Sequence, residues 1–334
     1  MLVYAPECTR HINLPGHVES PQRVEAILRK LEGLGLADPL REPEAVTRAQ
    51  VEAVHTKSYA DLVQHFGEGY LDTDTAIHPD THTYARLAAG GAVTAALACA
   101  ETGRPSLALV RPSGHHAGPD YGGGFCYFNN VAIAAAQLLD GFDRVAILDF
   151  DAHHGNGTRD IFAARRDVLY VSTHQSGIFP GTGPVEDVGD GQATGYTVNL
   201  PFPPRTGDST YTLAFDELID PIVRQYLPDA ILVSLGADAH YKDPLTGLGL
   251  SSPGYVSLAE RTLKLARSVA RGRVAFVLEG GYHLPALAEV FAGTYASFRG
   301  ESVHLQFRDI VDPNERGKET VRQAREILAK HWDL

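Results

Sequence analysis

Short apolar runs recur along the chain, with hydrophobic residues at consecutive positions rather than at alternate ones. Because both faces of such a run are apolar, the pattern is typical of parallel strands that helices cover on both sides. The runs predict strands over Ser106–Val110, Arg144–Asp149, Asp167–Thr173, Tyr196–Leu200, Ala230–Ser234 and Arg273–Leu278.

Helical patterns separate these runs. The segment Ala85–Glu101 is apolar on nearly all sides, which predicts a buried helix, whereas the C-terminal segment is amphipathic. The alternation of strands and helices predicts a single doubly wound α/β domain over residues 1–334, with the C-terminal helix at about 316–332 packed on it. The predicted helices are Pro21–Leu34, Ala85–Glu101, Asn130–Leu139, Ser209–Tyr226, Tyr255–Ala270, Leu284–Phe298 and Arg316–Trp332.

Composition narrows the range of functions. The formal net charge is −12, which argues against non-specific binding of nucleic acid because such binding depends on clustered Lys and Arg. An acidic chain is compatible with cationic substrates such as lysine-rich peptides or polyamines. No apolar run approaches the roughly 18 residues that a transmembrane helix needs, and the first residues lack the pattern of a secretory signal. We therefore expect a cytoplasmic protein without a membrane partner.

Unusual polar residues follow four of the predicted strands. In doubly wound sheets, ligands bind beyond the carboxyl ends of the strands, so we expect these four loops to converge at one end of the sheet. The polar segments are His115 and His116 after Val110, Asp149–His154 after Leu148, Asp238 after Ser234, and Tyr282 after Leu278.

The segment Asp149–Gly155 holds two carboxylates and two imidazoles within six residues. Burying these groups without partners would cost several kcal/mol, and alternation along an extended strand end places Asp149, Asp151 and His153 on one side. Zn²⁺ accepts carboxylate oxygen and imidazole nitrogen together. Asp238 suits a third ligand, although alone it would be interpreted as a helix cap. Three protein ligands leave a position open for water, as in catalytic zinc sites.

Two further segments carry groups suited to catalysis. His115 and His116 lie in a Gly/Pro loop, and His is the most frequent general base near neutral pH. Asp149 is positioned to orient His115 and raise its basicity. Tyr282 follows two glycines, and a phenol hydroxyl can donate to a developing oxyanion. A surface histidine pair and a structural tyrosine are the plain alternatives for these residues.

Together, these segments resemble the histone deacetylase family and its bacterial deacetylase-like and acetylpolyamine amidohydrolase relatives. The resemblance runs from about Tyr4 to Phe298, and Asn156 after His-His-Gly gives it a class II character. It is carried by His17–Arg23, Arg111–Ala117, Gly123–Asn129, Asp149–Gly157, Phe179–Gly183, Gly236–His240 and Leu278–Tyr282.

The resemblance implies the open α/β arginase–deacetylase fold, an eight-stranded parallel sheet with helices on both faces. It also implies a metal-dependent amidohydrolase that releases acetate and a free amine, with hydroxamate-type inhibitors expected to bind. The implied zinc ligands are Asp151, His153 and Asp238; the implied catalytic residues are His115, His116 and Tyr282, supported by Asp149 and Asn156.

Further residues are assigned by the resemblance alone. Gly124, Phe125, Phe179 and Leu245 would line the substrate channel, and Arg23 would lie beside an internal cavity for acetate release. Family members also bind potassium. The implied residues for one ion are Asp149, Asp151, His153, Ser172 and Thr173, and those for a second are Phe162, Arg165 and Val168.

Three alternatives compete with zinc-dependent deacetylation of acyl-lysine. Ureohydrolases of the same fold use two manganese ions, but Gly155 and Gly236 stand where the further carboxylates would be needed. A non-catalytic acyl-lysine binding protein would be expected to have lost a ligand, the histidine pair or the tyrosine. Deacetylation of small acylated amines or acetylpolyamines remains open. Leu245, in place of an acidic gate residue, and a short Phe66–Thr83 loop favour acyl-lysine on a peptide or protein.

Overall fold

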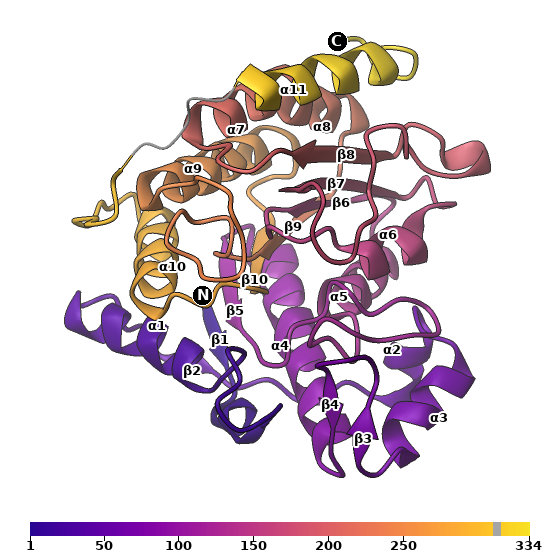
Figure 1. Ribbon diagram of the computed structural model, residues 1–334, viewed down its shortest axis with the longest axis vertical. Helices are drawn as coiled ribbons and strands as arrows, with labels where there is room; N and C mark the ends of the chain where they lie inside the picture. Colours follow the sequence, from indigo (N-terminus) through magenta and orange to yellow (C-terminus); the bar gives the residue numbers. More distant parts are fainter. Residues whose placement is uncertain (310–314) are drawn as a thin grey trace.

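The computed structural model describes residues 1–309 and 315–334. Eight strands form one sheet in the order β2-β1-β5-β10-β9-β6-β7-β8, and all neighbours pair in parallel (Figure 1). The eight-stranded parallel sheet is thus confirmed. Its strands are β1 (Leu2–Tyr4), β2 (Leu40–Arg41), β5 (Ser106–Leu109), β6 (Val145–Asp149), β7 (Val168–Gln175), β8 (Thr197–Phe202), β9 (Ala230–Leu235) and β10 (Val274–Leu278). A separate antiparallel pair joins β3 (Gly69–Tyr70) to β4 (Ala76–Ile77).

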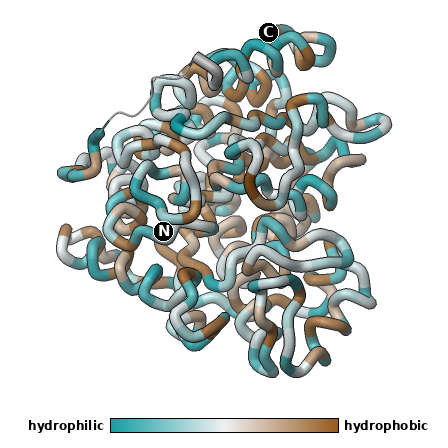
Figure 2. The backbone as a smooth tube through the Cα atoms, in the orientation of Figure 1, coloured by the Kyte–Doolittle hydropathy of each residue, from teal (hydrophilic) through white to brown (hydrophobic). Residues whose placement is uncertain are grey.

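Successive side chains of each central strand enter two different hydrophobic clusters. In β6, Ala146 and Leu148 belong to one cluster, and Val145 and Ile147 belong to the other. This follows from the two-residue repeat of a strand, and it explains why the runs are apolar at consecutive positions. Figure 2 shows the hydrophobic segments gathered inside the molecule, with mixed hydropathy along the C-terminal helix.

Helices cover both faces of the sheet. Residues of α1 and α7 to α11 pack in one cluster, and residues of α2 to α6 pack in the other. The helices are α1 (Gln22–Gly33), α2 (Arg48–Glu52), α3 (Lys57–His65), α4 (Thr81–Thr102), α5 (Asn130–Leu139), α6 (Asn156–Phe162), α7 (Asp208–Ala214), α8 (Asp220–Tyr226), α9 (Ser252–Val269), α10 (Leu284–Phe298) and α11 (Glu315–Leu328). Short 3-10 turns cover Pro6–Arg10 and Gly191–Ala193.

Two predicted helices differ in detail from the structure. The helix expected over 209–226 is interrupted by a π-helical turn, Phe215–Ile219, just before Pro221 at the start of α8. Proline has no N–H to donate to the preceding turn, which accounts for the break at this point. The C-terminal helix contacts β8 and α7 but ends at Leu328 rather than at residue 332.

The four loops that carry unusual polar residues follow four strands that are neighbours in the sheet, β5, β10, β9 and β6. Because these strands are parallel, their carboxyl ends meet at one edge, and the loops lie together there. Within the described parts of the chain, none of the helices combines the length and the apolar character needed to span a membrane.

Candidate active site

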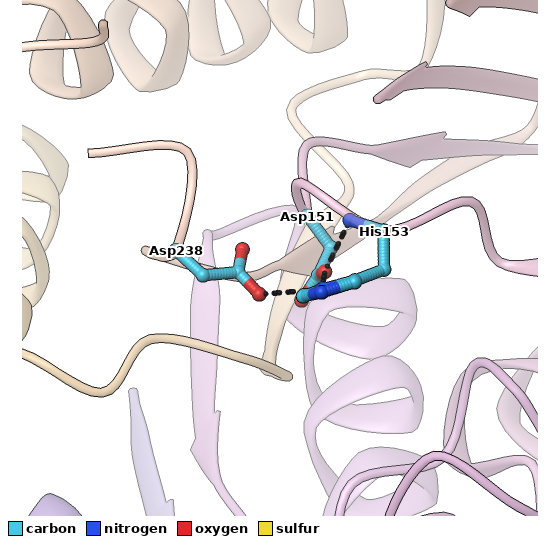
Figure 3. A group of neighbouring side chains, drawn as sticks. All are labelled: Asp151, His153 and Asp238. Carbon is cyan, nitrogen blue, oxygen red and sulfur yellow. Dashed lines mark hydrogen bonds and ion pairs between the residues drawn. The ribbon is translucent and has the colours of Figure 1, made fainter. Parts of the chain in front are cut away.

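Three candidate metal ligands come from two neighbouring strands. Asp151 and His153 follow β6, and Asp238 follows β9. One ligand atom of each residue lies within 4.8 Å of the other two, and Figure 3 shows the three side chains converging. His153 Nδ1 lies 3.1 Å from Asp151 Oδ1 and 2.9 Å from Asp238 Oδ2. Among residues 1–309 and 315–334, this is the one group of three or more such side chains with metal-site spacing.

The chemistry of this donor set fits a divalent cation. Both carboxylates are buried, and each uses an oxygen to accept a backbone N–H at 2.8 Å, Asp151 from Gly280 and Asp238 from Ala152. Each carboxylate also has an oxygen near the same ring nitrogen of His153, Nδ1. Two negative charges and one imidazole at one point need a cation for balance, and zinc takes this combination of oxygen and nitrogen ligands.

The buried carboxylates of Asp151 and Asp149 pack directly against backbone, which explains the glycines at positions 236 and 155. A Cβ at Gly236 would lie 2.0 Å from Asp151 Oδ2, and one at Gly155 would lie 2.4 Å from Asp149 Oδ2. No acidic side chain can occupy either position unless its neighbour moves. The local packing therefore agrees with the interpretation of a single metal rather than two.

His115 is paired with a buried carboxylate. Its Nδ1 lies 3.1 Å from Asp149 Oδ2, which also accepts a hydrogen bond of 3.0 Å from the Tyr170 hydroxyl. Burial lowers the pKa of His115, but the negative charges of Asp151 and Asp149 have a larger effect and raise this pKa to about 10. The charge of Asp149 favours the protonated form of the His115 ring, and its role in orienting His115 stays a prediction.

His116 is paired with an amide instead. Its Nδ1 lies 2.8 Å from Asn156 Oδ1, and its ring centroid is 4.0 Å from that of His115. Burial lowers the pKa of His116 well below 6.5, and positive charge on the neighbouring histidines lowers it further. The environment therefore keeps His116 neutral, the form that a general base requires.

Tyr282 lies across the same pocket, on the turn after β10. Burial raises the pKa of Tyr282 well above 10, so the side chain is a neutral phenol with a proton to donate. Its ring contacts Phe125 edge-to-face with centroids 6.1 Å apart, and the guanidinium carbon of Arg23 lies 5.0 Å from its ring centre.

A pocket of about 260 Å³ joins these groups to the surface. Phe179 is half exposed at its mouth and contacts His116 with ring centroids 4.9 Å apart. The structure brings the four predicted channel residues together in this pocket, while their contact with a substrate stays a prediction. The lining residues are Thr73, Asp74, Ser113, His115, His116, Gly124, Phe125, Asp151, His153, Ile178, Phe179, Leu245, Gly280 and Tyr282.

Comparison with known proteins decides the family. The model for the histone deacetylase domain matches residues 17–297 of this chain. This chain belongs to the histone deacetylase family. A probable deacetylase of Archaeoglobus fulgidus is 41% identical over 308 residues, covering 90% of this chain and 86% of the relative. The histone deacetylase-like amidohydrolase of Pseudomonas aeruginosa is 35% identical over 337 residues, covering 96% of this chain and 88% of the relative.

The structural comparison agrees with the sequence comparison. The HDA15 HD domain matches this chain with a TM-score of 0.90 and 30% identity, covering 99% of this chain and 95% of that one. The arginase–deacetylase fold expected from the resemblance is therefore confirmed. Membership of the histone deacetylase family supports the hydrolysis of acyl amides as the activity of this chain.

In this family member, Arg23 is completely buried and holds the turn that carries Tyr282. Its Nε donates to the carbonyl of Gly281 at 2.7 Å, one terminal nitrogen donates to the carbonyl of Glu279, and the other donates to the Glu19 carboxylate at 3.2 Å. Arg23 does not line the substrate pocket. Its place beside a cavity for acetate release stays a prediction.

The residues predicted for potassium lie on β6, β7 and α6 and in the adjoining loops. In the structure, the Ser172 hydroxyl bonds to His174 Nδ1 at 2.9 Å, and the Thr173 hydroxyl donates to the Asp149 carbonyl at 3.3 Å. The Phe162 carbonyl accepts the Arg165 N–H at 2.9 Å. Potassium binding at either site stays a prediction.

Sequence reasoning missed two buried carboxylates that position the active-site loops. Glu279 Oε2 accepts the N–H groups of Gly114 and His115 at 2.8 and 3.3 Å, and burial raises the pKa of Glu279 to about 7. Asp243 Oδ2 likewise accepts the N–H group of Tyr282 at 2.7 Å. Glu279 lies within the recognised segment Leu278–Tyr282 and Asp243 lies three residues after the recognised segment Gly236–His240, but the partners of both acids are backbone groups of distant loops.

Proposed function

We propose that this chain is a zinc-dependent deacetylase that hydrolyses acyl-lysine side chains of peptides or proteins. The observation that carries the proposal is the meeting of three groups at the bottom of one pocket. These are the cluster Asp151, His153 and Asp238, the neutral base His116, and the phenol of Tyr282.

A zinc ion held by the three ligands supplies Lewis acidity toward the amide carbonyl and lowers the pKa of a water molecule. His116, kept neutral by its surroundings, takes a proton from the attacking water. Tyr282 donates a hydrogen bond to the oxygen on which negative charge develops. The histidine pair then returns a proton to the leaving nitrogen, so that acetate and a free amine are released.

The walls of the pocket favour an unbranched apolar chain. Phe125 and Phe179 supply aromatic surface, and Leu245 supplies an aliphatic side chain that is 41% exposed. The methylene groups of a lysine side chain gain from burial against such walls. A leucine offers no charge to a second amine, which supports acyl-lysine over acetylpolyamine.

A second candidate is the deacetylation of small acylated amines or acetylpolyamines. Asp74 is exposed and lines the same pocket, so its carboxylate offers a charge near the mouth to a cationic group. This observation keeps polyamines as the competing substrate class.

The experiment that separates these two substrate classes compares kcat/KM for an acetyl-lysine peptide, acetylputrescine and acetylspermidine. The zinc-loaded chain is used, with and without a hydroxamate chelator. We expect the peptide to be the best substrate and the hydroxamate to stop turnover. Preference for acetylspermidine would move the assignment to polyamines. Binding of the peptide without hydrolysis of any substrate would make the protein a non-catalytic reader of acyl-lysine.

A further inference from the structure

The hydrogen-bond partner of His116 is the side-chain amide of Asn156, which carries an oxygen at one end and an NH₂ group at the other. Asn156 presents Oδ1 to His116 Nδ1 at 2.8 Å, and an oxygen there can only accept, so the imidazole proton must be on Nδ1. The lone pair is then on Nε2. If the amide were flipped, its NH₂ group would face Nδ1 and the proton would move to Nε2. In that tautomer the ring could not accept a proton through Nε2.

His115 has no such ambiguity, because both oxygens of its partner Asp149 are acceptors. Free histidine favours the tautomer with the proton on Nε2. An asparagine beside the proposed base therefore needs something that fixes its orientation.

A chain of two hydrogen bonds on the far side of Asn156 meets that need. Asn156 Nδ2 donates to the Tyr121 hydroxyl at 3.0 Å, and this hydroxyl donates to Asp160 Oδ2 at 2.6 Å. A carboxylate oxygen accepts, so the single phenol proton points to Asp160. The phenol oxygen then accepts from Asn156, which turns the NH₂ group away from His116 and the carbonyl oxygen toward it.

We propose that Tyr121 and Asp160 are positioning residues that fix the amide of Asn156 and thereby the tautomer of His116. The proposal rests on the proposed function of His116 as the base. Neither residue lines the pocket, and the hydrogen bonds that connect them to His116 pass through Asn156.

The hydrogen-bonded chain of Asn156, Tyr121 and Asp160 forms a relay, and the local fold holds it in place. Asn156 and Asp160 are four residues apart on α6, so they share one face of the helix, and the Tyr121 hydroxyl bridges them. The Tyr121 ring lies on Gly118, where an added Cβ would be 2.3 Å from ring atoms, and the Gly118 N–H donates to the Tyr121 carbonyl at 2.9 Å. Burial and the hydrogen bond to Asp160 raise the pKa of Tyr121, so the phenol keeps its proton.

The test is a double-mutant cycle on zinc-loaded protein. Tyr121→Phe removes the hydroxyl and leaves the ring, and we expect kcat/KM to fall about tenfold through kcat, with KM little changed. Asn156→Asp gives His116 a partner whose oxygens both accept, so the orientation no longer depends on Tyr121. In that background, Tyr121→Phe is expected to change kcat/KM by less than about twofold.

Tyr295→Phe is the matched control. The Tyr295 hydroxyl also donates to an aspartate, Asp38, at 2.6 Å, but Tyr295 does not line the pocket, so we expect kcat/KM to be unchanged. Equal losses from Tyr121→Phe in the unsubstituted protein and in the Asn156→Asp background would overturn the proposal, because they would indicate a general structural role.

A second measurement does not depend on activity. The ¹⁵N shifts of the His116 ring, assigned by comparison with His116→Ala, report which nitrogen carries the proton. We expect the proton on Nδ1 in the unsubstituted protein, and a shift toward Nε2 in Tyr121→Phe and in Asp160→Ala, which removes the acceptor of the Tyr121 proton. Unchanged ring shifts in both variants would refute the relay. If no acyl amide is hydrolysed, the proposed function fails, and these shifts alone decide whether the relay exists.

Discussion

The Asp243 carboxylate accepts a hydrogen bond of 2.7 Å from the backbone N–H of Tyr282. Its other oxygen accepts the Leu245 N–H at 3.0 Å. Tyr282 and Leu245 both line the substrate pocket, and they lie on loops that follow different strands, β10 and β9. The buried side chain of Asp243 thus fixes the position of Tyr282, the phenol proposed for catalysis, relative to Leu245 in the apolar wall of the pocket.

Replacement of Asp243 by Asn tests this coupling. An amide has one acceptor oxygen, so one of the two N–H groups loses its partner, and we expect kcat for an acetyl-lysine peptide to fall about tenfold at unchanged zinc content. Asp208→Asn is the control, because Asp208 also accepts a hydrogen bond on each oxygen, from the Ser251 N–H at 2.8 Å and the Ser251 hydroxyl at 2.5 Å, but outside the pocket. If both variants lowered kcat alike, the role of Asp243 would be one of general stability.

Loss of a ligand and loss of the phenol should have different consequences. Asp238→Ala removes one of three ligands, and we expect the purified variant to hold no stoichiometric zinc. Tyr282→Phe leaves the ligands intact, and we expect full zinc content with kcat reduced by about 10² or more. Metal analysis beside steady-state kinetics checks both expectations. Stoichiometric zinc in Asp238→Ala would refute the ligand assignment, and near-normal turnover in Tyr282→Phe would refute the role of the phenol.

A methyl group at position 236 should weaken metal binding although none of the three proposed ligands is replaced. In Gly236→Ala, the new Cβ would meet Asp151 Oδ2 at 2.0 Å, so the carboxylate must move from its place in the cluster. We expect zinc affinity, measured by competition with a chelator, to fall about tenfold or more. Gly33→Ala is a suitable control because a Cβ there meets nothing within 4 Å. Equal zinc affinity in the two variants would contradict this account.

Leu245 offers a direct test of substrate choice. A carboxylate in this partly exposed wall position would attract the second amine of a polyamine. In Leu245→Glu, we expect the ratio of kcat/KM for acetylspermidine to that for the peptide to rise about tenfold. Leu245→Gln has a similar shape without the charge and should leave the ratio near its original value. A similar rise in both variants would point to shape rather than charge.

The sequence predicted those strands and helices whose hydrophobic pattern is complete within one segment of the chain. The strands from β5 onward are apolar on both faces, so their runs are visible without any partner. The convergence of His116, Asp151, Asp238 and Tyr282 followed from the rule that the carboxyl ends of parallel strands meet. The strands β1 and β2 were missed because they span three and two residues, too few to show a pattern.

Contacts between side chains of different loops could not be predicted from the sequence. Tyr121 and Asp160 are 39 positions apart, and neither differs from an ordinary surface residue until the loop after β5 is placed beside α6. Asp243 follows the recognised segment Gly236–His240, but one of the two N–H groups from which it accepts belongs to Tyr282 and is placed only by the folded turn after β10. Such pairs depend on side-chain conformation, which hydrophobic periodicity does not encode.

Acid should lower the free energy of unfolding through His55, which lies just before α3 and hydrogen-bonds to the loops at Gly118 and Asn129. His55 Nδ1 lies 2.7 Å from the Gly118 carbonyl, and Nε2 accepts the Asn129 N–H at 2.9 Å. Only the neutral ring can make both bonds, because a protonated Nε2 would face another donor. Burial lowers the pKa of His55 from 6.5 to about 4, against a smaller opposite effect of the Gly118 carbonyl.

Because the folded pKa of His55 is below the unfolded value, the unfolded chain binds the proton more tightly. The contribution to stability is therefore full above pH 6.5 and is lost as the pH falls toward 4, by about 3 kcal/mol in total. Urea unfolding of His55→Gln should show a free energy that is lower at pH 7 and depends less on pH over this range. His65→Gln, at an exposed histidine of α3, should keep the original pH dependence. If His55→Gln kept it too, His55 would not be the acid-sensitive group.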